Sequence, residues 1–207
     1  MARQPTLVGN TVLLVIDIQA SAFMPTPADG GAIPHVADYP DRMTRALEVI
    51  QAARDVDMPT VYIQEIHRKN NIDYGRELDG SEGIHCREDH PGTALPKEIT
   101  GQRESDYFVP KRRYSAFFGT DLEILLKGLK AETLILIGGM TDVCVHYTFV
   151  DGHQHDYHCR VVTDSCGATS EAAHEASMNA MEYLQTGAVL TNKEIIAAMK
   201  GTAKAAA

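Results

Sequence analysis

Short apolar runs typical of buried strands alternate along this chain with stretches of helical character. Alternation of this kind indicates a parallel sheet whose strands are joined by crossover helices. The sequence therefore predicts an α/β protein, a three-layer α/β/α sandwich around a doubly wound, mainly parallel six-stranded sheet. The six strand candidates are Val12–Ile18, Thr60–Gln64, Tyr107–Val109, Thr133–Ile137, Arg160–Thr163 and Ala188–Leu190.

Helices are predicted in most of the intervals between these runs. Tyr39–Val56 has apolar residues at helical spacing, and Ser170–Leu184 is rich in alanine and glutamate. Thr120 and Glu123 have the spacing of a capping box, which would start a further helix. The alanine-rich tail after Met199 is expected to fray.

The length of 207 residues suits one domain with a substantial core, since a chain near this size buries roughly 70% of its unfolded surface. We expect a single domain over residues 1–207, ordered from about residue 8 to residue 199, with the alanine-rich tail beyond it. No apolar run approaches the ~20 residues that span a bilayer, and no signal-peptide pattern is seen. These features favour a cytoplasmic protein.

Charge and cysteine content exclude several classes of protein. The net charge is −9, and the only marked basic cluster is Lys111–Arg113, so nucleic acid and anionic membranes are poor candidate partners. The four cysteines show no CxxC spacing, which argues against a disulfide framework and predicts reduced thiols.

Cys144 lies just after a predicted strand-to-helix turn. The apolar run Leu134–Ile137 stops at Gly138 and Gly139, and Thr141 is placed to cap the helix that follows. In the first turn of that helix Cys144 would lie near the positive end of the dipole, which lowers a thiol's pKa and favours the thiolate. The alternative is a buried, inert cysteine.

Two charged residues end other strand candidates and supply partners for this thiol. Asp17 falls near the end of the first apolar run, and Lys111 follows Tyr107–Val109. Because ligands bind at the carboxyl ends of parallel strands, Asp17, Lys111 and Cys144 are expected to form one site. The carboxylate would take the thiol proton while the ammonium stabilises the charged forms. In isolation, Asp17 reads as a turn residue and Lys111 as part of a solvated cluster.

These residues lie in three blocks that resemble the signature blocks of the isochorismatase-like cysteine hydrolases. The blocks are Ile16–Gln19, Val109–Thr120 and Gly138–Thr148. The superfamily includes nicotinamidases, N-carbamoylsarcosine amidases, ureidoacrylate and biuret hydrolases, and true isochorismatases. The resemblance extends over nearly the whole chain, and the order and spacing of the three blocks make it specific.

The resemblance also implies a role for each residue. Cys144 would be the nucleophile, Asp17 the base and Lys111 the stabilising cation. An oxyanion hole would be formed by the backbone N–H groups of Met140 and Cys144. In the relatives the peptide that enters this hole is a non-proline cis bond, which here would be Gly139–Met140.

A long charged segment between the second and third strand candidates also resembles a nicotinamidase feature, the metal-binding block. The resemblance implies Glu65, His67 and His85 as ligands of Zn²⁺ or Fe²⁺, with coordination positions left open for water or a substrate nitrogen. The nicotinamidase acid is Asp, however, whereas Glu65 carries one more methylene.

For that reason we favour a metal-free pocket. In this interpretation Glu65, Arg68, Arg76 and Glu77 form a polar network that binds the substrate, and the two histidines are hydrogen-bonding pocket residues. A third interpretation makes these residues surface ion pairs on a long loop.

The sequence thus predicts a cysteine amidohydrolase that cleaves a small amide, carbamoyl or ureido substrate through a thioester. The alternatives are a metal-containing, nicotinamidase-like aromatic amidase and a catalytically silent module that serves in interactions. Relatives suggest a homodimer or homotetramer.

Overall fold

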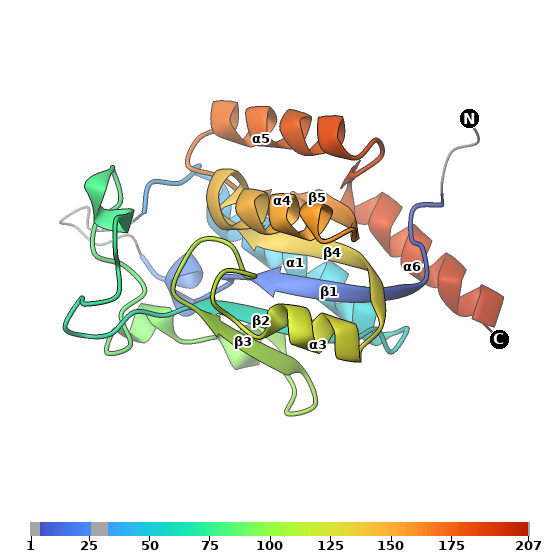
Figure 1. Cartoon of the computed structure of the whole chain (residues 1–207), viewed down its shortest axis with the longest axis horizontal. Helices are drawn as coiled ribbons and strands as arrows, with labels where there is room; N and C mark the ends of the chain where they lie inside the picture. The colour runs from blue at the N-terminus through green and yellow to red at the C-terminus, as the bar shows by residue number, and fades with distance from the viewer. Residues whose placement is uncertain (1–4, 26–32, 207) are drawn as a thin grey trace.

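The computed structural model describes residues 5–25 and 33–206, with side chains described up to residue 201 (Figure 1). Six strands form one sheet in the order β3-β2-β1-β4-β5-β6, and every neighbouring pair is parallel. The predicted fold class is therefore confirmed. The strands are β1 (Asn10–Ile16), β2 (Thr60–Glu65), β3 (Tyr107–Lys111), β4 (Ala131–Gly139), β5 (His158–Gly167) and β6 (Val189–Leu190).

The chain order reverses between the two central strands. β1 pairs with β2 on one side and with β4 on the other, so the sheet grows outward in both directions from this point. Ligand sites of doubly wound sheets lie outside the carboxyl ends of the strands at such a reversal. Both central strands are buried on both faces, which explains why they read as continuous apolar runs.

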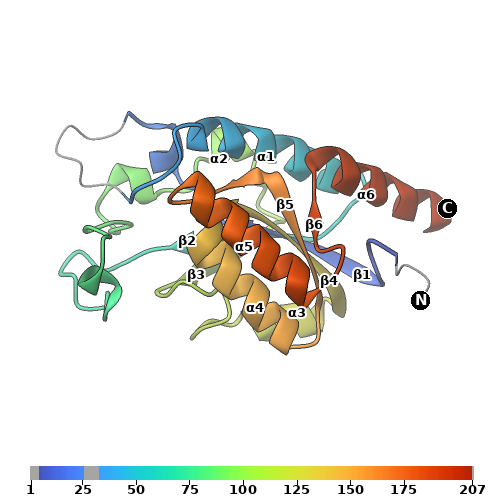
Figure 2. The same cartoon turned by 90° about the horizontal axis from the view of Figure 1, so that it is seen from above.

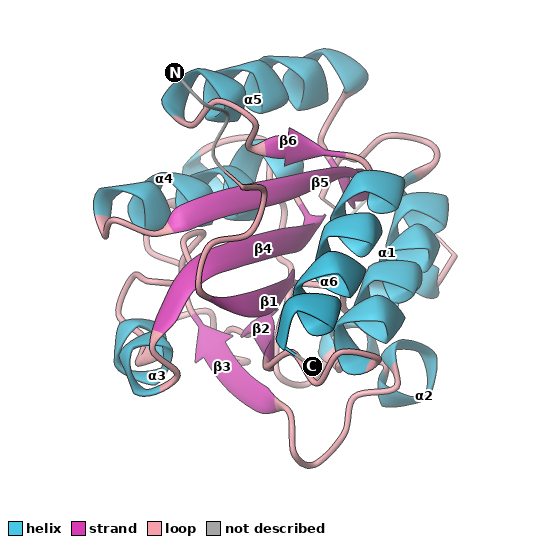
Figure 3. Cartoon of the chain, turned by 90° about the vertical axis from the view of Figure 1, so that its right-hand side faces the viewer, coloured by secondary structure: helices cyan, strands magenta, loops and turns pink. Residues whose placement is uncertain are grey.

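Helices cover both faces of the sheet (Figures 2 and 3). One face carries α1 and α6, and the other carries α3, α4 and α5. Among the described residues, none of the helices has the length and apolar character required to cross a membrane. The helices are α1 (Tyr39–Arg54), α2 (Lys97–Thr100), α3 (Leu122–Gly128), α4 (His146–Gln154), α5 (Glu171–Leu184) and α6 (Asn192–Ala206).

Side chains alternate along the strands between two apolar cores. On β1, Leu13 and Val15 face the core shared with α1 and α6, where Met43 is fully buried. Val12 and Leu14 face the opposite core, under α3, α4 and α5. This alternation, together with the crossover helices, fixes the register of the strands and hence the position of each strand end.

Two predicted helix features are wrong in detail. The expected capping box does not form, because α3 begins at Leu122 after Asp121, which places Glu123 at the second helical position instead of the third. Thr120 Oγ1 instead accepts a hydrogen bond from the Leu122 N–H at 3.2 Å. Glu123 pairs with Lys127 one turn further along.

The second error concerns the C-terminal segment. The tail after Met199 was expected to fray, but α6 continues through Ala206. The high helix propensity of alanine explains the extension, and Ile195 and Met199, both fully buried, anchor the preceding turns. Residue 207, the end of the predicted tail, lies outside the described residues.

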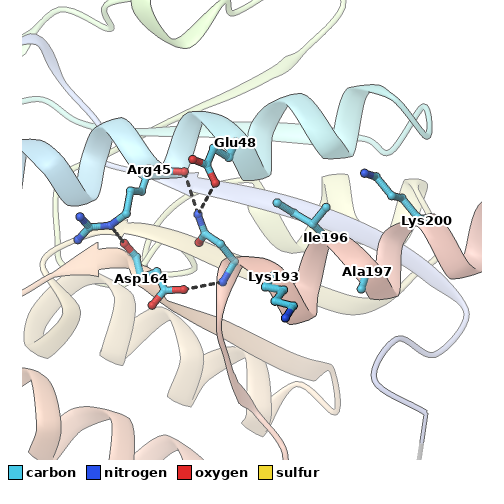
Figure 4. Close-up of a pocket in the computed structure, with 8 residues that line it drawn as sticks. Arg45, Glu48, Asp164, Lys193, Ile196, Ala197 and Lys200 are labelled. Atoms are coloured by element: carbon cyan, nitrogen blue, oxygen red, sulfur yellow. Dashed lines mark hydrogen bonds between the residues drawn. The ribbon is translucent and has the colours of Figure 1, made fainter.

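A hollow of about 510 Å³ lies along the seam between α1 and α6 (Figure 4). Arg45 Nε donates to the Asp164 carbonyl oxygen at 3.0 Å, and the Asn192 N–H donates to Asp164 Oδ2 at 2.8 Å. The Asn192 side chain donates to the Arg45 carbonyl oxygen at 3.1 Å. These polar groups are hydrogen-bonded to one another, and through them the start of α6 is held against α1.

Gly138 in β4 lies where the backbone of β1 leaves no room for a side chain. Its φ is +119°, and a Cβ at this position would lie 1.9 Å from the carbonyl oxygen of Ile16. We expect Gly138→Ala to lower the free energy of unfolding by more than about 3 kcal/mol, because both the conformation and the clash involve backbone. Urea unfolding checks this. Gly128→Ala is the control: it has open space around it and should change stability by less than about 1 kcal/mol. Equal effects of the two substitutions would contradict this account.

Candidate active site

Four strands deliver one polar residue each to the same edge of the sheet. Asp17 directly follows β1, Glu65 ends β2, Lys111 ends β3, and Cys144 lies in the single π-helical turn Thr141–Val145 (η4) that follows β4. Glu65 and Lys111 are register partners in neighbouring strands. The structure thus brings together the three residues that the sequence proposed as one site, and it adds Glu65.

Lys111 is the centre of this group. Its side chain is fully buried, and Nζ lies 2.8 Å from Asp17 Oδ2, 2.5 Å from Glu65 Oε2 and 3.4 Å from Cys144 Sγ. Burial alone lowers the pKa of a lysine, but Asp17, Cys144 and Glu65 together raise the pKa of Lys111 well above its ordinary value. The ammonium is therefore a permanent cation.

The thiol of Cys144 does not have the lowered pKa expected from its place at a helix start. Burial raises its pKa well above the ordinary value, and the lowering effect of Lys111 is opposed by Asp17 and Glu65. That prediction was wrong because it counted the helix dipole and one cation but neither burial nor the second carboxylate. At rest Cys144 carries its proton and lies 3.5 Å from Glu65 Oε2.

Asp17 lies close to the same thiol. One of its carboxylate oxygens and Cys144 Sγ belong to a group of atoms within 4.8 Å of one another. Burial raises the pKa of Asp17, Lys111 lowers it, Glu65 raises it again, and the net direction is upward. A carboxylate with a raised pKa is a better base than an ordinary one. Its orientation is fixed, since Oδ1 accepts the N–H of Glu65 at 2.7 Å.

The turn before Cys144 has the predicted cis peptide. The bond between Gly139 and Met140 is cis, as the resemblance implied. The predicted cap is wrong, because Met140 is the residue that precedes the helical turn and no side chain caps it. The hydroxyl of Thr141 instead lies 3.0 Å from His174 Nδ1, since α5 brings that imidazole within reach.

Side chains from neighbouring elements hold this turn. The other ring nitrogen of His174 lies 3.0 Å from Thr163 Oγ1 on β5. Asp142 accepts a hydrogen bond from the Thr169 N–H at 3.0 Å. These contacts could not be predicted from local sequence patterns, because each joins residues from separate helices, strands or loops.

The loop after β2 gathers a second polar cluster around Glu65. His85 Nε2 lies 2.8 Å from Glu65 Oε1, and His67 Nε2 lies 3.2 Å from Glu77 Oε2. All four side chains are almost fully buried. Two carboxylates and two imidazoles are donors that suit a divalent cation, and they lie close enough together to hold one.

The two predicted arginines lie apart from this cluster. Arg68 is exposed, and the side chain of Arg76 is 93% exposed and pairs with Asp79. The sequence could not indicate which way the loop turns its side chains. It also gave no indication that Tyr74 stacks on His67, with ring centroids 4.0 Å apart.

A cavity of about 520 Å³ lies beside the cluster. Glu77 forms part of its wall and connects it to the buried histidines. Thr169 in the same wall donates a hydrogen bond to Asp142, two residues before Cys144. Tyr114 also lines the cavity and donates to Glu82 Oε2 at 3.0 Å. The cavity therefore lies next to both the cluster and the turn that carries Cys144.

Comparison with known proteins agrees with the fold. A model of the isochorismatase domain matches residues 11–194. The uncharacterized isochorismatase family protein YecD of Escherichia coli O157:H7 is 28% identical over 92% of this chain and 96% of its own. The ureidoacrylate amidohydrolase RutB of Stutzerimonas stutzeri is 26% identical over 84% of this chain and 75% of its own. A cysteine hydrolase structure from Pseudomonas syringae has a TM-score of 0.80 at 25% identity, covering 97% of this chain and 99% of that one.

The parallel α/β sheet carries a carboxylate, a lysine and a buried cysteine at the carboxyl ends of its strands. Its fold and its relatives are those of a family of hydrolases. The chain belongs to the isochorismatase family.

Removing the charge of Lys111 and removing the charge of Glu65 should change the reactivity of the Cys144 thiol in opposite directions. Lys111 lowers the pKa of Cys144 and Glu65 raises it. Lys111→Met should therefore slow alkylation by iodoacetamide at fixed pH, and Glu65→Gln should accelerate it, each by about tenfold or more. The rate is measured by mass spectrometry in a Cys86→Ser background, since Cys86 is the one other cysteine that is not fully buried. If both substitutions changed the alkylation rate in the same direction, these two charges would not determine the pKa of Cys144.

Proposed function

We propose that this protein is a cysteine-dependent amidohydrolase that cleaves the C–N bond of a small amide, carbamoyl or ureido substrate through a thioester. The supporting observation is the contact of Lys111 Nζ with both Asp17 Oδ2, at 2.8 Å, and Cys144 Sγ, at 3.4 Å. A buried ammonium that touches a carboxylate and a thiol stabilises negative charge on either one. When a proton passes from Cys144 to Asp17, the negative charge therefore stays in contact with the Lys111 ammonium.

The reaction follows from this arrangement. Asp17 takes the proton of Cys144, and the sulfur attacks the substrate carbonyl carbon. The oxygen becomes an oxyanion that accepts the N–H groups of Met140 and Cys144. The C–N bond then breaks, and the leaving nitrogen takes the proton from Asp17. Water attacks the thioester, Asp17 accepts a proton from it, and the acid product leaves as the sulfur regains its proton.

The adjoining cavity supports a small polar substrate. Its wall presents both a cation, Arg76, and carboxylates, Glu77 and Glu82. An amide or urea offers a carbonyl acceptor and N–H donors on the same small plane, so such a mixed wall suits it. These contacts keep Arg76 and Glu77 as candidate substrate-binding residues.

A metal-containing aromatic amidase is the second candidate. The buried cluster of Glu65, His67 and His85 favours it. A cation bound there would supply positive charge beside Glu65, and every proton transfer would still be made by the chain's own residues. A silent interaction module is less well supported, because the buried contacts among Asp17, Lys111 and Cys144 would have no use in one.

Replacement of the nucleophile should abolish turnover and leave the fold intact. Cys144→Ala and Cys144→Ser should each retain less than about 1% of the activity, since no other thiol contacts Lys111 among the described residues. The assay is ammonia release from nicotinamide, pyrazinamide, N-carbamoyl amino acids, biuret and ureidoacrylate. Cys159→Ser is the control and should remain active. Substantial activity in Cys144→Ala would exclude the thioester mechanism.

The pH dependence of kcat/KM should reflect the protonation of Asp17. Its pKa is raised by burial and by Glu65, and the carboxyl must be deprotonated to accept the thiol proton. Activity should therefore fall as pH drops through this raised value, so the acid limb of kcat/KM lies above the ordinary range of an aspartate. Asp17→Asn should remove turnover at every pH. An acid limb at the ordinary aspartate value, or wild-type turnover in Asp17→Asn, would place the base elsewhere.

A further inference from the structure

The imidazole of His174 joins the turn before Cys144 to the neighbouring strand β5. Its Nδ1 lies 3.0 Å from Thr141 Oγ1 in η4, and its Nε2 lies 3.0 Å from Thr163 Oγ1 on β5. Thr141 is fully buried, and His174 is only 6% exposed. Three elements, η4, β5 and α5, therefore meet at one ring.

This ring needs both hydroxyl groups as partners. Burial lowers the pKa of His174, and the charge of Arg42 lowers it further, so the ring is neutral at pH 7. A neutral imidazole has one N–H donor and one acceptor nitrogen. One hydroxyl therefore accepts a hydrogen bond from the ring while the other donates one to it. Because a buried polar group without a partner is unfavourable, the bridge holds Thr141 and Thr163 at a fixed separation.

A second attachment to β5 lies on the other side of Met140. Gly139, the last residue of β4, is the register partner of Gly167 in β5. Met140 thus lies between two residues that are both attached to the same strand, Gly139 through strand pairing and Thr141 through the imidazole. These two attachments restrict rotation of the backbone at Met140.

The N–H of Met140 is available for an acceptor from outside the chain. Among residues 5–25 and 33–206, no acceptor lies within hydrogen-bonding geometry of this N–H. The carbonyl oxygen of Met140, in contrast, accepts the N–H groups of Val143 and Val145, each at 3.1 Å. A single π-helical turn has few backbone hydrogen bonds of its own. Contacts from outside the turn must therefore set the direction of the available N–H.

We propose that His174 is a positioning residue that, through Thr141, holds the N–H of Met140 in the direction required to bind the oxyanion. The role rests on the proposed thioester chemistry, in which an oxyanion forms, but not on the identity of the amide. His174 acts through the turn and has no part in the proton transfer between Cys144 and Asp17.

Two reactions of the Cys144 thiol separate this role from a general effect on the fold. p-Nitrophenyl acetate acylates a thiol by way of an oxyanion, whereas iodoacetamide alkylates it by displacement of iodide and forms no oxyanion. Neither reaction needs the natural substrate, so the test remains decisive even if no amide in the ammonia-release assay is cleaved. Both rates are measured on the full-length protein in the Cys86→Ser background, by p-nitrophenolate release and by mass spectrometry.

The contact of the ring with the turn is tested by Thr141→Val, which removes the hydroxyl and keeps a side chain of similar size. Acylation should slow tenfold or more, because a displaced oxyanion donor loses much of its effect, while alkylation should change less than about threefold. Thr141→Ser keeps a hydroxyl and should acylate within about threefold of the wild-type rate. Equal slowing of both reactions, unchanged acylation in Thr141→Val, or a wild type that is not acylated at Cys144 would each overturn the proposal.

The imidazole itself is tested by His174→Asn and His174→Gln. The amide of asparagine lies near the position of Nδ1 and can bond to Thr141, whereas that of glutamine reaches the position of Nε2 and faces Thr163. His174→Asn should therefore acylate within about threefold of the wild-type rate, and His174→Gln should be slower by tenfold or more. Both should be alkylated at nearly the wild-type rate.

Ser177→Ala is the matched control, because Ser177 is also buried and lies about one turn further along α5. It should change neither rate. The assignment of His174 would be wrong if a folded His174→Gln protein, checked by circular dichroism, acylated as fast as the wild type. It would also be wrong if His174→Asn acylated no faster than His174→Gln.

Discussion

The ammonium of Lys111 is the charge on which the whole active edge of the sheet depends. Taking a cation out of water costs several kcal/mol unless paired charges and hydrogen bonds compensate it. The compensating carboxylates come from β1 and β2, because Asp17 follows one strand and Glu65 ends the other. A shift of either strand by one residue would turn these side chains to the opposite face. Core packing sets the register of the strands, and the register places Asp17 and Glu65 against Lys111, which therefore stays charged beside Cys144.

Glu65 connects two clusters that the sequence treated separately. Its Oε2 faces Lys111 and the thiol, and its Oε1 faces the histidines of the loop. Burial raises the pKa of this carboxyl, yet Lys111, His67 and His85 together hold it well below its ordinary value. The longer arm of a glutamate explains this double contact, because the carboxylate extends far enough to lie between the two clusters. The extra methylene, which counted against a metal site in the sequence, is what joins the histidine cluster to Lys111 and Cys144.

The sequence predicted what strand periodicity can encode. Six strands and the residues at their ends followed from apolar runs and their boundaries, since parallel strands align their carboxyl ends. The pKa direction of Cys144 could not be predicted in this way, because it depends on how deeply the thiol is buried and on Glu65. The hydroxyl of Thr141 was misassigned for a related reason, since its partner His174 comes from a distant helix. Periodicity did not show that Glu77 points inward while Arg76 points to solvent.

The raised thiol pKa is compatible with catalysis when the proton transfer is treated as a property of the pair. Moving a proton from Cys144 to Asp17 leaves the total charge of the site unchanged, so burial penalises the states before and after the transfer to a similar extent. The difference between them then depends on Lys111, which lies 2.8 Å from the carboxylate and 3.4 Å from the sulfur. The closer contact favours the negative charge on Asp17 at rest and the proton on the thiol. In the proposed reaction the sulfur would bond to the carbonyl carbon as its proton moves to Asp17, and the negative charge would pass to the carbonyl oxygen, so a free thiolate need not accumulate in the resting site.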